Sequence, residues 1–426
     1  MIIMNLRPHQ TRAFDSMQEN DKGQIIVPTG GGKTYIMIAD TLKRFKLPVA
    51  QTTVVVAPRI LLANQLCAEF LEHNLDGHYN QGVDVAHVHS GETHHFSTTN
   101  QFELNTWVNN SKKHILIFTT YHSLQKVVNA VDVEVDTIYF DEAHNGCGKH
   151  FHIALSQIVQ YAKRSYFFTA TPRMGRGVSL DRGMNNTAVY GGVLENVPAQ
   201  ELIKSGAIVP PKIVPFETRN STPRDKYNAH EIDADNLRDI IDTFDDSQNN
   251  KILVAAPSSR VLGNMLGHTT ILEYFKDNGY DVMHITSKFG AIINGTKVGR
   301  EEFFDTLTKW GQDDNKRFVI FHYSILSEGI NVPGLTHTVL LRNLPIIEMA
   351  QTIGRVIRVH SDDRKSVADG LIPAGAFHLY KKQFGQVSVP TGQKRGDAIG
   401  KRLPVSYTHL RAHETKANLV CRLLLE

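Results

Sequence analysis

The chain alternates short, continuous apolar runs with longer amphipathic segments. Between Gln24 and Thr171 the apolar runs are QIIVP, TTVVVAP, HILIFTT, VDTIYFDEAH and RSYFFTATP. A second series begins at Lys251 and comprises KILVAAPS, YDVMHITS, KRFVIFHYS and HTVLLRN. Runs of Val, Ile and Phe separated by helices are typical of a parallel sheet that helices cover on both faces. The pattern therefore predicts two α/β domains in tandem.

The stretch between the two series is rich in proline. VPPKIVPFETRNSTPRD (209–225) contains four prolines among polar residues, which favours an extended linker. We therefore expect a first domain at residues 1–210, a linker at 211–225 and a second domain at 226–404.

Residues 405–426 differ in character from the rest of the chain. Within VSYTHLRAHETKANLVCRLLLE, the first half resembles one reading frame of a transposase adapter, and LVCRLLLE resembles the adjoining flow-cell sequence. Lys416, Ala417 and Asn418 between them match the length of an index. We interpret the stretch as adapter-derived and exclude it from fold reasoning, so we expect the native end of the second domain to be missing. The alternative is a real amphipathic terminal helix, for which only LVCRLLL is suited.

Charge and cysteine content restrict the possible functions only weakly. The 46 Lys and Arg residues barely exceed the 43 Asp and Glu residues, so nucleic-acid binding would depend on local surface rather than on bulk charge. Cys67, Cys147 and Cys421 make no disulfide framework and fit a reducing compartment. Neither a signal peptide nor a run of about 18 apolar residues is present. We expect a soluble cytoplasmic protein with no membrane partner.

A glycine-rich loop lies between an apolar strand and an amphipathic helix in IIVPTGGGKTYIMIADTLKRF. Its members are Thr29, Gly30, Gly31, Gly32, Lys33 and Thr34. Glycines let a backbone wrap closely around phosphates, Lys33 can reach the terminal phosphates, and the Thr34 hydroxyl can bind Mg²⁺. The full pattern G-x-x-x-x-G-K-T fails at its first position, which is Val27. A glycine turn without a ligand is the alternative, but the strand-to-helix context favours a nucleotide site.

Two acids follow a later apolar run directly. In DTIYFDEAH, Asp141 can hold Mg²⁺ through water and Glu142 can act as a general base. A phosphate loop needs such a partner at the end of a neighbouring strand, so each signal completes the other.

The residues after these acids raise the possibility of a metal site. Candidate zinc ligands are His144, Cys147, His150 and His152. No second cysteine pair lies nearby, so zinc is the less favoured interpretation. The histidine-rich stretch AHVHSGETHHF (86–96) is interpreted as surface histidines around a loop.

Five motifs occur in order between Pro28 and Arg358: PTGGGKT, DEAH, FTATP, LSEGINVPG and QTIGRVIR. Together they resemble the DEAD/DEAH-type superfamily 2 helicases and translocases, which also carry an aliphatic residue where Val27 stands. TTYHSL and LSEGINVPGL are most similar to compact phage helicases and to the helicase subunits of type III restriction enzymes and related branch-migration enzymes. The resemblance implies two tandem RecA-like domains with parallel sheets, an ATP cleft between them, and ATP and Mg²⁺ as ligands.

The resemblance also implies roles for residues of the first domain. In LRPHQ, Arg7 and Gln10 would recognise adenine; an ordinary helix start at Pro8 is the alternative. The expected nucleic-acid contacts are Pro58, Arg59, Thr120 and Tyr121. The residues expected to couple hydrolysis to domain movement are His144, Thr169, Ala170 and Thr171.

In the second domain the resemblance implies that Gly329 and Asn331 contact ATP and nucleic acid. Asn331 stands where many members have Asp, which puts its ATP contact in doubt. Gln351 would contact the γ-phosphate, and Arg355 and Arg358 would be arginine fingers. Their i, i+3 spacing predicts that both guanidinium groups lie on one helical face; a solvated helix face is the alternative.

These expectations amount to an ATP-dependent helicase that acts on DNA rather than RNA, in a bacterial or phage-infected cell. One alternative is an ATP-driven translocase that remodels branched DNA or serves a nuclease partner without processive unwinding. Another is a non-hydrolysing nucleic-acid-binding module, against which Lys33, Glu142 and the arginine pair argue. The sequence does not identify which nuclease, replication or recombination partner the protein would serve.

Overall fold

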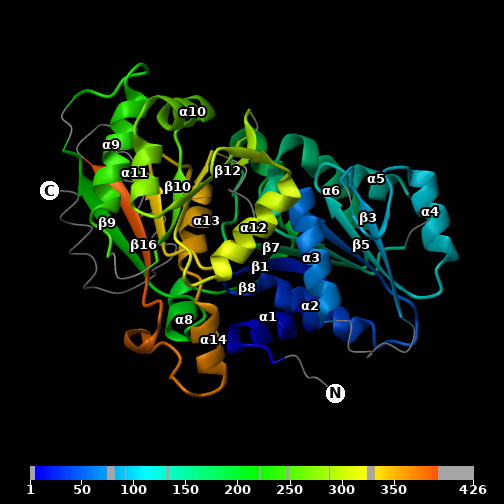
Figure 1. Cartoon of the computed structure of the whole chain (residues 1–426). Helices are drawn as coiled ribbons and strands as arrows, with labels where there is room; N and C mark the ends of the chain where they lie inside the picture. The colour runs from blue at the N-terminus through cyan, green and yellow to red at the C-terminus, as the bar shows by residue number, and fades with distance from the viewer. Residues whose placement is uncertain are drawn as a thin grey trace. The chain divides into compact units, whose positions relative to one another are not determined.

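The chain forms two compact units, Met1–Val197 and Pro198–Glu426. The structure, a computed structural model shown in Figure 1, describes residues 5–73, 82–91, 93–130, 134–219, 222–245, 249–286, 288–323 and 332–391. The adapter-like residues 405–426 lie outside these ranges. In the described part of the chain, no helix combines the length and the apolar character needed to cross a membrane.

The first unit is built on an eight-stranded sheet in the order β4-β3-β5-β2-β6-β7-β1-β8. Every strand pair in it is parallel. The strands are β1 (Lys22–Ile26), β2 (Thr52–Ala57), β3 (Val83–Val88), β4 (Phe96–Ser97), β5 (His114–Thr120), β6 (Thr137–Phe140), β7 (Arg164–Thr169) and β8 (Gly192–Asn196). Because the strands are parallel, their carboxyl ends all lie at one edge of the sheet, where ligands bind in open α/β folds.

Helices cover both faces of this sheet (Figure 1). The α-helices are α1 (Pro8–Glu19), α2 (Lys33–Arg44), α3 (Ile60–Glu72), α4 (Gln101–Asn110), α5 (Leu124–Asn129), α6 (Lys149–Tyr161) and α7 (Thr187–Tyr190), and the 3₁₀ helices are η1 (Ala143–Cys147) and η2 (Gly177–Arg182). On one face, Leu104 of α4, Leu124 of α5 and Leu155 of α6 pack in one buried cluster with Val54 and Val56 of β2. The opposite face carries α1, α2 and α3, of which α2 contacts both of the others.

The second unit has its own eight-stranded sheet, in the order β13-β12-β11-β14-β10-β15-β16-β9. Its strands are β9 (Pro211–Glu217), β10 (Lys251–Ala255), β11 (Asp281–Thr286), β12 (Gly290–Ile293), β13 (Thr296–Val298), β14 (Phe318–His322), β15 (His337–Leu340) and β16 (Gly385–Thr391). The pairs β11–β12 and β12–β13 are antiparallel, and the other pairs are parallel. This sheet is therefore mixed, with an antiparallel hairpin at one edge.

The helices of the second unit are α8 (Ala199–Lys204), α9 (Ala229–Ile241), α10 (Ser259–His268), α11 (Ile271–Asp277), α12 (Arg300–Gln312), α13 (Ile346–Val356) and α14 (Ser361–Ala368), with the 3₁₀ helix η3 (Phe377–Leu379). Leu237 of α9, Leu262 of α10 and Phe275 of α11 form one buried cluster with Ile252 and Val254 of β10. Helices α12 and α13 carry other buried apolar residues, such as Phe303 and Ile353.

Each of the nine apolar runs in the sequence contains a strand, as the pattern predicts. The proline-rich stretch behaves differently. Residues Pro211–Glu217, expected to be linker, form β9, which pairs with β16 along its whole length. The two units also divide between Val197 and Pro198 rather than at residue 210. Proline is tolerated here because β9 lies at the edge of the sheet, where a missing backbone N–H breaks no ladder.

Candidate functional site

The glycine-rich loop follows β1 and ends where α2 begins at Lys33. Gly30 and Gly32 have φ values of 86° and 79°, in the left-handed region that side chains rarely adopt. A Cβ atom on Gly32 would also lie 2.4 Å from Nε2 of Gln10. The backbone conformation therefore favours glycine at position 32, and a side chain there would also displace the Gln10 amide; the first N–H groups of α2, which follow directly, have no partner within the helix.

Two side chains of α1 hold this loop. His9 Nε2 donates to the Gly31 carbonyl at 2.8 Å, and Gln10 Nε2 donates to the Gly32 carbonyl at 3.1 Å. Both residues are buried, and Gln10 Oε1 accepts the backbone N–H of Arg7 at 2.8 Å. Both ends of the Gln10 amide are thus engaged by the protein itself. Sequence reasoning missed His9, although it lies inside the LRPHQ segment already singled out.

The DEAH segment lies two strands away at the same edge. Asp141 and Glu142 directly follow β6, and the sheet order β6-β7-β1 puts only β7 between them and the loop. Lys33 Nζ lies 3.2 Å from Glu142 Oε1, and both side chains are nearly buried, 11% and 7% exposed. Glu142 has φ 46°, so its backbone is left-handed without being glycine, which costs about 1 kcal/mol. The structure therefore brings the lysine and the glutamate together in a strained, largely dry position.

Asp141 is a buried carboxyl group beside this pair. Burial and, to a smaller extent, the neighbouring Glu142 charge raise its pKa, Lys33 partly opposes them, and the resulting pKa is about 7. A carboxylate in such a place is stabilised by added positive charge. Together with the Thr34 hydroxyl at the start of α2, it fits the oxygen ligands that Mg²⁺ prefers.

His144 lies next to the same acids and reaches the end of β7. Its Nδ1 atom is 3.0 Å from Oγ1 of Thr169 and 3.6 Å from Oε2 of Glu142. Thr169 Oγ1 also accepts the backbone N–H of Thr171 at 3.1 Å. Hydrogen bonds therefore join His144 to the segment Thr169–Thr171, which includes the half-buried Ala170, and the same His144 ring lies close to the Glu142 carboxylate.

The candidate zinc residues have other partners. Cys147 Sγ lies 3.7 Å from the Arg173 carbonyl and 3.6 Å from the Tyr190 hydroxyl. In the described part of the chain, a group of three potential metal ligands is found only at Asp314, His360 and Asp362. There the Lys381 ammonium already pairs with both carboxylates and offsets part of their charge.

The expected nucleic-acid contacts lie at the ends of β2 and β5. Arg59 is exposed at the start of α3, after the buried Pro58. Thr120 and Tyr121 are buried, and the Tyr121 hydroxyl donates to the Asp141 carbonyl at 2.9 Å. A side-chain contact between Tyr121 and nucleic acid does not fit this burial. The exposed residue beside them is His122, whose ring packs edge-on against Phe151.

The histidine-rich stretch is only partly superficial. His94 and His95 are exposed as expected, but His87 and His89 are buried. His87 Nδ1 lies 2.9 Å from His89 Nε2, and His89 Nε2 lies 3.2 Å from Asn64 Oδ1. Burial lowers the pKa of His87 to about 4. The expectation of surface histidines was therefore wrong for these two, because His87 lies on β3 and His89 follows it directly, next to Asn64 of α3.

In the second unit, Gln351 and Arg355 lie one turn apart on α13 and are buried, 5% and 3% exposed. Arg358 is not on this helix. The helix α13 ends at Val356, and the backbone of Arg358 forms an antiparallel β-bridge with that of Ile208. The expectation that both arginines share one helical face was therefore wrong. Gly329 and Asn331 lie outside the described residues.

Residues 3–174 match the family described as "Type III restriction enzyme, res subunit". A search of curated protein sequences gives no match. The matched range contains the glycine-rich loop, the DEAH segment and the Thr169 segment. The resemblance to superfamily 2 helicases and translocases of the res-subunit type is thus confirmed for this part of the chain.

Two solved structures are similar over nearly the whole chain. One is an ATP-dependent Type ISP restriction-modification enzyme, LlaBIII, bound to DNA, with a TM-score of 0.65 and 16% identity over 94% of this chain and 30% of that one. The other is a nuclease-deletion mutant of the Type ISP enzyme LlaGI in complex with a DNA substrate mimic, with a TM-score of 0.62 and 17% identity over 94% and 29%. The chain thus spans less than a third of these enzymes. At such identities the likeness is one of fold, and it confirms tandem RecA-like domains.

Proposed function

We propose that this chain is an ATP-dependent motor that acts on DNA and couples ATP hydrolysis to strand separation. The observation that carries the proposal is the 3.2 Å pair between Lys33 and Glu142 beside the glycine-rich loop. A phosphate-binding cation and a candidate general base are held together there. The match of residues 3–174 to the res-subunit family supports the same reading.

The residues of the first unit divide the work as follows. The loop from Thr29 to Thr34 binds the ATP phosphates through its backbone N–H groups. Lys33 leaves Glu142 for the phosphates when ATP binds, because the phosphates carry more charge. Glu142 is then available to accept a proton from the attacking water. Asp141 and Thr34 would hold Mg²⁺, which when bound offsets phosphate charge.

Other residues are proposed in supporting roles. Arg7, whose backbone N–H donates to Gln10, is proposed for the adenine, whereas the Gln10 amide is engaged with the loop backbone. The contacts of His144 with Glu142 and Thr169 are proposed to transmit changes at the γ-phosphate to the segment after β7. The proposed phosphate contacts of the second unit are Gln351, Arg355 and Arg358, as the resemblance implies.

DNA is the proposed nucleic acid. The two similar structures are restriction-modification enzymes in complex with DNA or a DNA mimic. At the edge of the first sheet, Arg59 and His122 are the exposed groups beside the predicted backbone contacts. Binding through such groups would follow the phosphate backbone and weaken with salt.

A second candidate is a translocase that moves along DNA without separating its strands, for a nuclease partner or at branched DNA. The comparisons favour it specifically, because the matching family and both solved structures come from restriction enzymes. A non-hydrolysing binding module is disfavoured, because it has no use for the paired Lys33 and Glu142.

ATP turnover with and without DNA tests the proposal. We expect DNA to stimulate phosphate release, and Lys33→Ala or Glu142→Gln to reduce turnover by roughly a thousandfold or more, because each removes a group that acts on the reacting phosphate. Lys43→Ala is the matched control, since Lys43 lies on the same helix with its ammonium over the Phe14 ring, and it should keep wild-type turnover. Wild-type turnover in both site variants would contradict the mechanism.

A second assay separates the two motor functions. Strand displacement from a forked duplex reports unwinding, and displacement of a triplex-forming strand reports translocation alone. Comparing DNA with RNA forks identifies the nucleic acid. Triplex displacement without fork unwinding would select the translocase.

A further inference from the structure

The segment after α13 is held from several sides although it is no longer helical. Val209 N–H donates to the Ile357 carbonyl at 2.8 Å, and the backbone of Arg358 forms an antiparallel β-bridge with that of Ile208. A Cβ atom on Gly385 would lie 2.3 Å from the Val356 carbonyl oxygen, so the start of β16 passes directly against the helix end. The backbone of Arg358 is thus fixed by contacts that no helix provides.

The most central of these contacts comes from Lys382. Its Nζ donates to the Arg358 carbonyl at 2.8 Å and to the Leu335 carbonyl at 2.6 Å. The residue is 7% exposed. Leu335 belongs to the VPGL sequence before β15, so one ammonium group joins the chain ahead of β15 to the chain after α13. Lys382 lies outside all five motifs.

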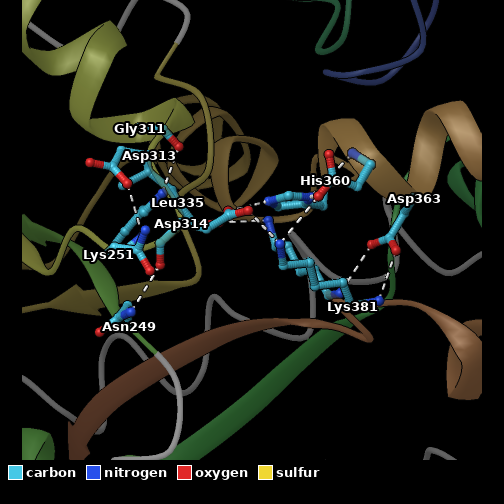
Figure 2. A network of polar contacts seen from close by, with 12 residues as sticks. Asn249, Lys251, Gly311, Asp313, Asp314, Leu335, His360, Asp363 and Lys381 are labelled. Atoms are coloured by element: carbon cyan, nitrogen blue, oxygen red, sulfur yellow. Dashed lines mark hydrogen bonds and ion pairs between the residues drawn. The ribbon is translucent and has the colours of Figure 1, made fainter.

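The backbone of Lys382 is itself held in place. The buried Asp363 carboxylate accepts the backbone N–H of Lys381 at 2.7 Å and that of Lys382 at 3.0 Å. The Lys381 side chain pairs with Asp314, which His360 also contacts at 2.9 Å (Figure 2). Two elements, α14 and the turn after α12, therefore anchor the short segment from which Lys382 projects.

A buried ammonium group is costly, and burial lowers the pKa of Lys382 to about 7, with the Arg358 charge adding to the effect and Asp363 opposing it. Even the neutral amine keeps two N–H groups, one for each carbonyl. The double contact with Arg358 and Leu335 is thus available in either charge state. Apolar residues of similar length could fill the space but could not hold the two carbonyls.

We propose that Lys382 is a positioning residue that fixes the backbone of Arg358, and so the direction of its guanidinium group, for ATP hydrolysis. The inference rests on the proposed function, in which Arg358 contacts the phosphates. Lys382 does not touch the reacting atoms. It acts through Arg358 only.

The test compares Lys382→Met with Lys251→Met in the full chain. Lys251 is the matched control, because it is also a buried lysine of this unit whose Nζ donates to a carbonyl, that of Gly311 at 2.7 Å. We expect Lys382→Met to lower kcat for DNA-stimulated ATP hydrolysis by roughly tenfold to a hundredfold, with the KM for ATP changed less than about twofold, because the lost alignment matters in the transition state. Lys251→Met should keep the wild-type kcat even if its melting temperature falls equally.

A double variant shows whether the effect passes through Arg358. Arg358→Ala combined with Lys382→Met should have the kcat of Arg358→Ala alone, since nothing remains to be positioned. Equal kcat in wild type and folded Lys382→Met, or additive losses in the double variant, would overturn the proposal. If Lys382→Met does not fold, Lys382→Gln decides, because its shorter amide cannot span both carbonyls; a wild-type kcat would again overturn it. Absence of DNA-stimulated turnover in the wild-type chain would instead overturn the proposed function.

Discussion

The glycine-rich loop of the first unit and the arginine segment of the second unit are both expected to contact phosphates, yet they are held in different ways. The loop takes its shape from Gly30 and Gly32, whose left-handed conformations belong to the motif itself. The arginine segment takes its shape from Ile208 and Lys382, which lie far from it in the sequence. A local sequence motif therefore predicts the backbone geometry of a site when its own glycines determine that geometry. It does not predict the geometry when residues distant in the sequence determine it.

Two glycines with left-handed backbone conformations, Gly32 in the first unit and Gly279 in the second, test whether glycine determines the geometry of the phosphate loop. Gly32→Ala should weaken ATP binding and lower kcat/KM by roughly a hundredfold or more, because φ is 79° and the new Cβ meets Gln10. Gly279→Ala is the control, since φ is 69° but nothing lies within 4 Å. It should cost only about 1 kcal/mol of folding stability. Nucleotide-binding titrations and thermal melts of both variants check this; equal activity losses would show that strain alone was responsible.

The two units should also respond to pH in opposite directions. Burial raises the pKa of Asp141 from 3.8 to about 7 and lowers the pKa of Lys382 from 10.5 to about 7. The folded state holds the Asp141 proton more tightly, so the stability from this group is lost as pH rises from about 4 to 7. The unfolded state holds the Lys382 proton more tightly, so the stability from that group grows as pH rises from about 7 to 10.5.

Difference measurements isolate the two groups. The unfolding free energy of wild type relative to Asp141→Asn should fall across the acid window, and that relative to Lys382→Met should rise across the alkaline window, each by at most about 1.4 kcal/mol per pH unit. Denaturant titrations from pH 4 to 10 provide both curves. Slopes of the same sign would show that, for one of the two groups, folding does not shift the pKa in the direction described.

The smallest effect is expected at a buried hydroxyl. Tyr121→Phe removes the donor to the Asp141 carbonyl and should cost about 1 kcal/mol of unfolding free energy. Tyr274→Phe removes an exposed hydrogen bond to Asp242 in the second unit and should cost less than about 0.5 kcal/mol. Urea unfolding of both variants measures the difference. A larger loss of unfolding free energy in Tyr274→Phe than in Tyr121→Phe would contradict the burial of the Tyr121 hydroxyl.

Much of the fold could be predicted from the sequence because buried parallel strands are continuous apolar runs, as in TTVVVAP and KILVAAPS. Strand β9 could not, because Pro211 and Pro215 suggest a linker unless the strand is known to lie at a sheet edge. The β12–β13 hairpin was missed although Asn294 and Gly295, with φ values of 47° and 81°, are a typical turn pair between two short strands.

Only part of the candidate site could be predicted from the sequence. Lys33 and Glu142 were found from local motifs, and the structure places them 3.2 Å apart. The end of α13 was not found, because VIR continues an amphipathic pattern, and the contacts that hold the chain after the helix come from residues distant in the sequence, such as Ile208 and Lys382. Lys382 carries no local signal at all, since its role depends on two carbonyls more than twenty residues away.

The left-handed backbone at Glu142 has an implication for how such a chain would change under selection. Glycine would relieve about 1 kcal/mol of strain there, but it would also remove the carboxylate that pairs with the nearly buried Lys33 ammonium, and breaking a buried ion pair costs more than that strain. Selection for thermal robustness and selection for turnover should therefore both retain glutamate at this position, so the strain persists in a lineage as long as the lysine does.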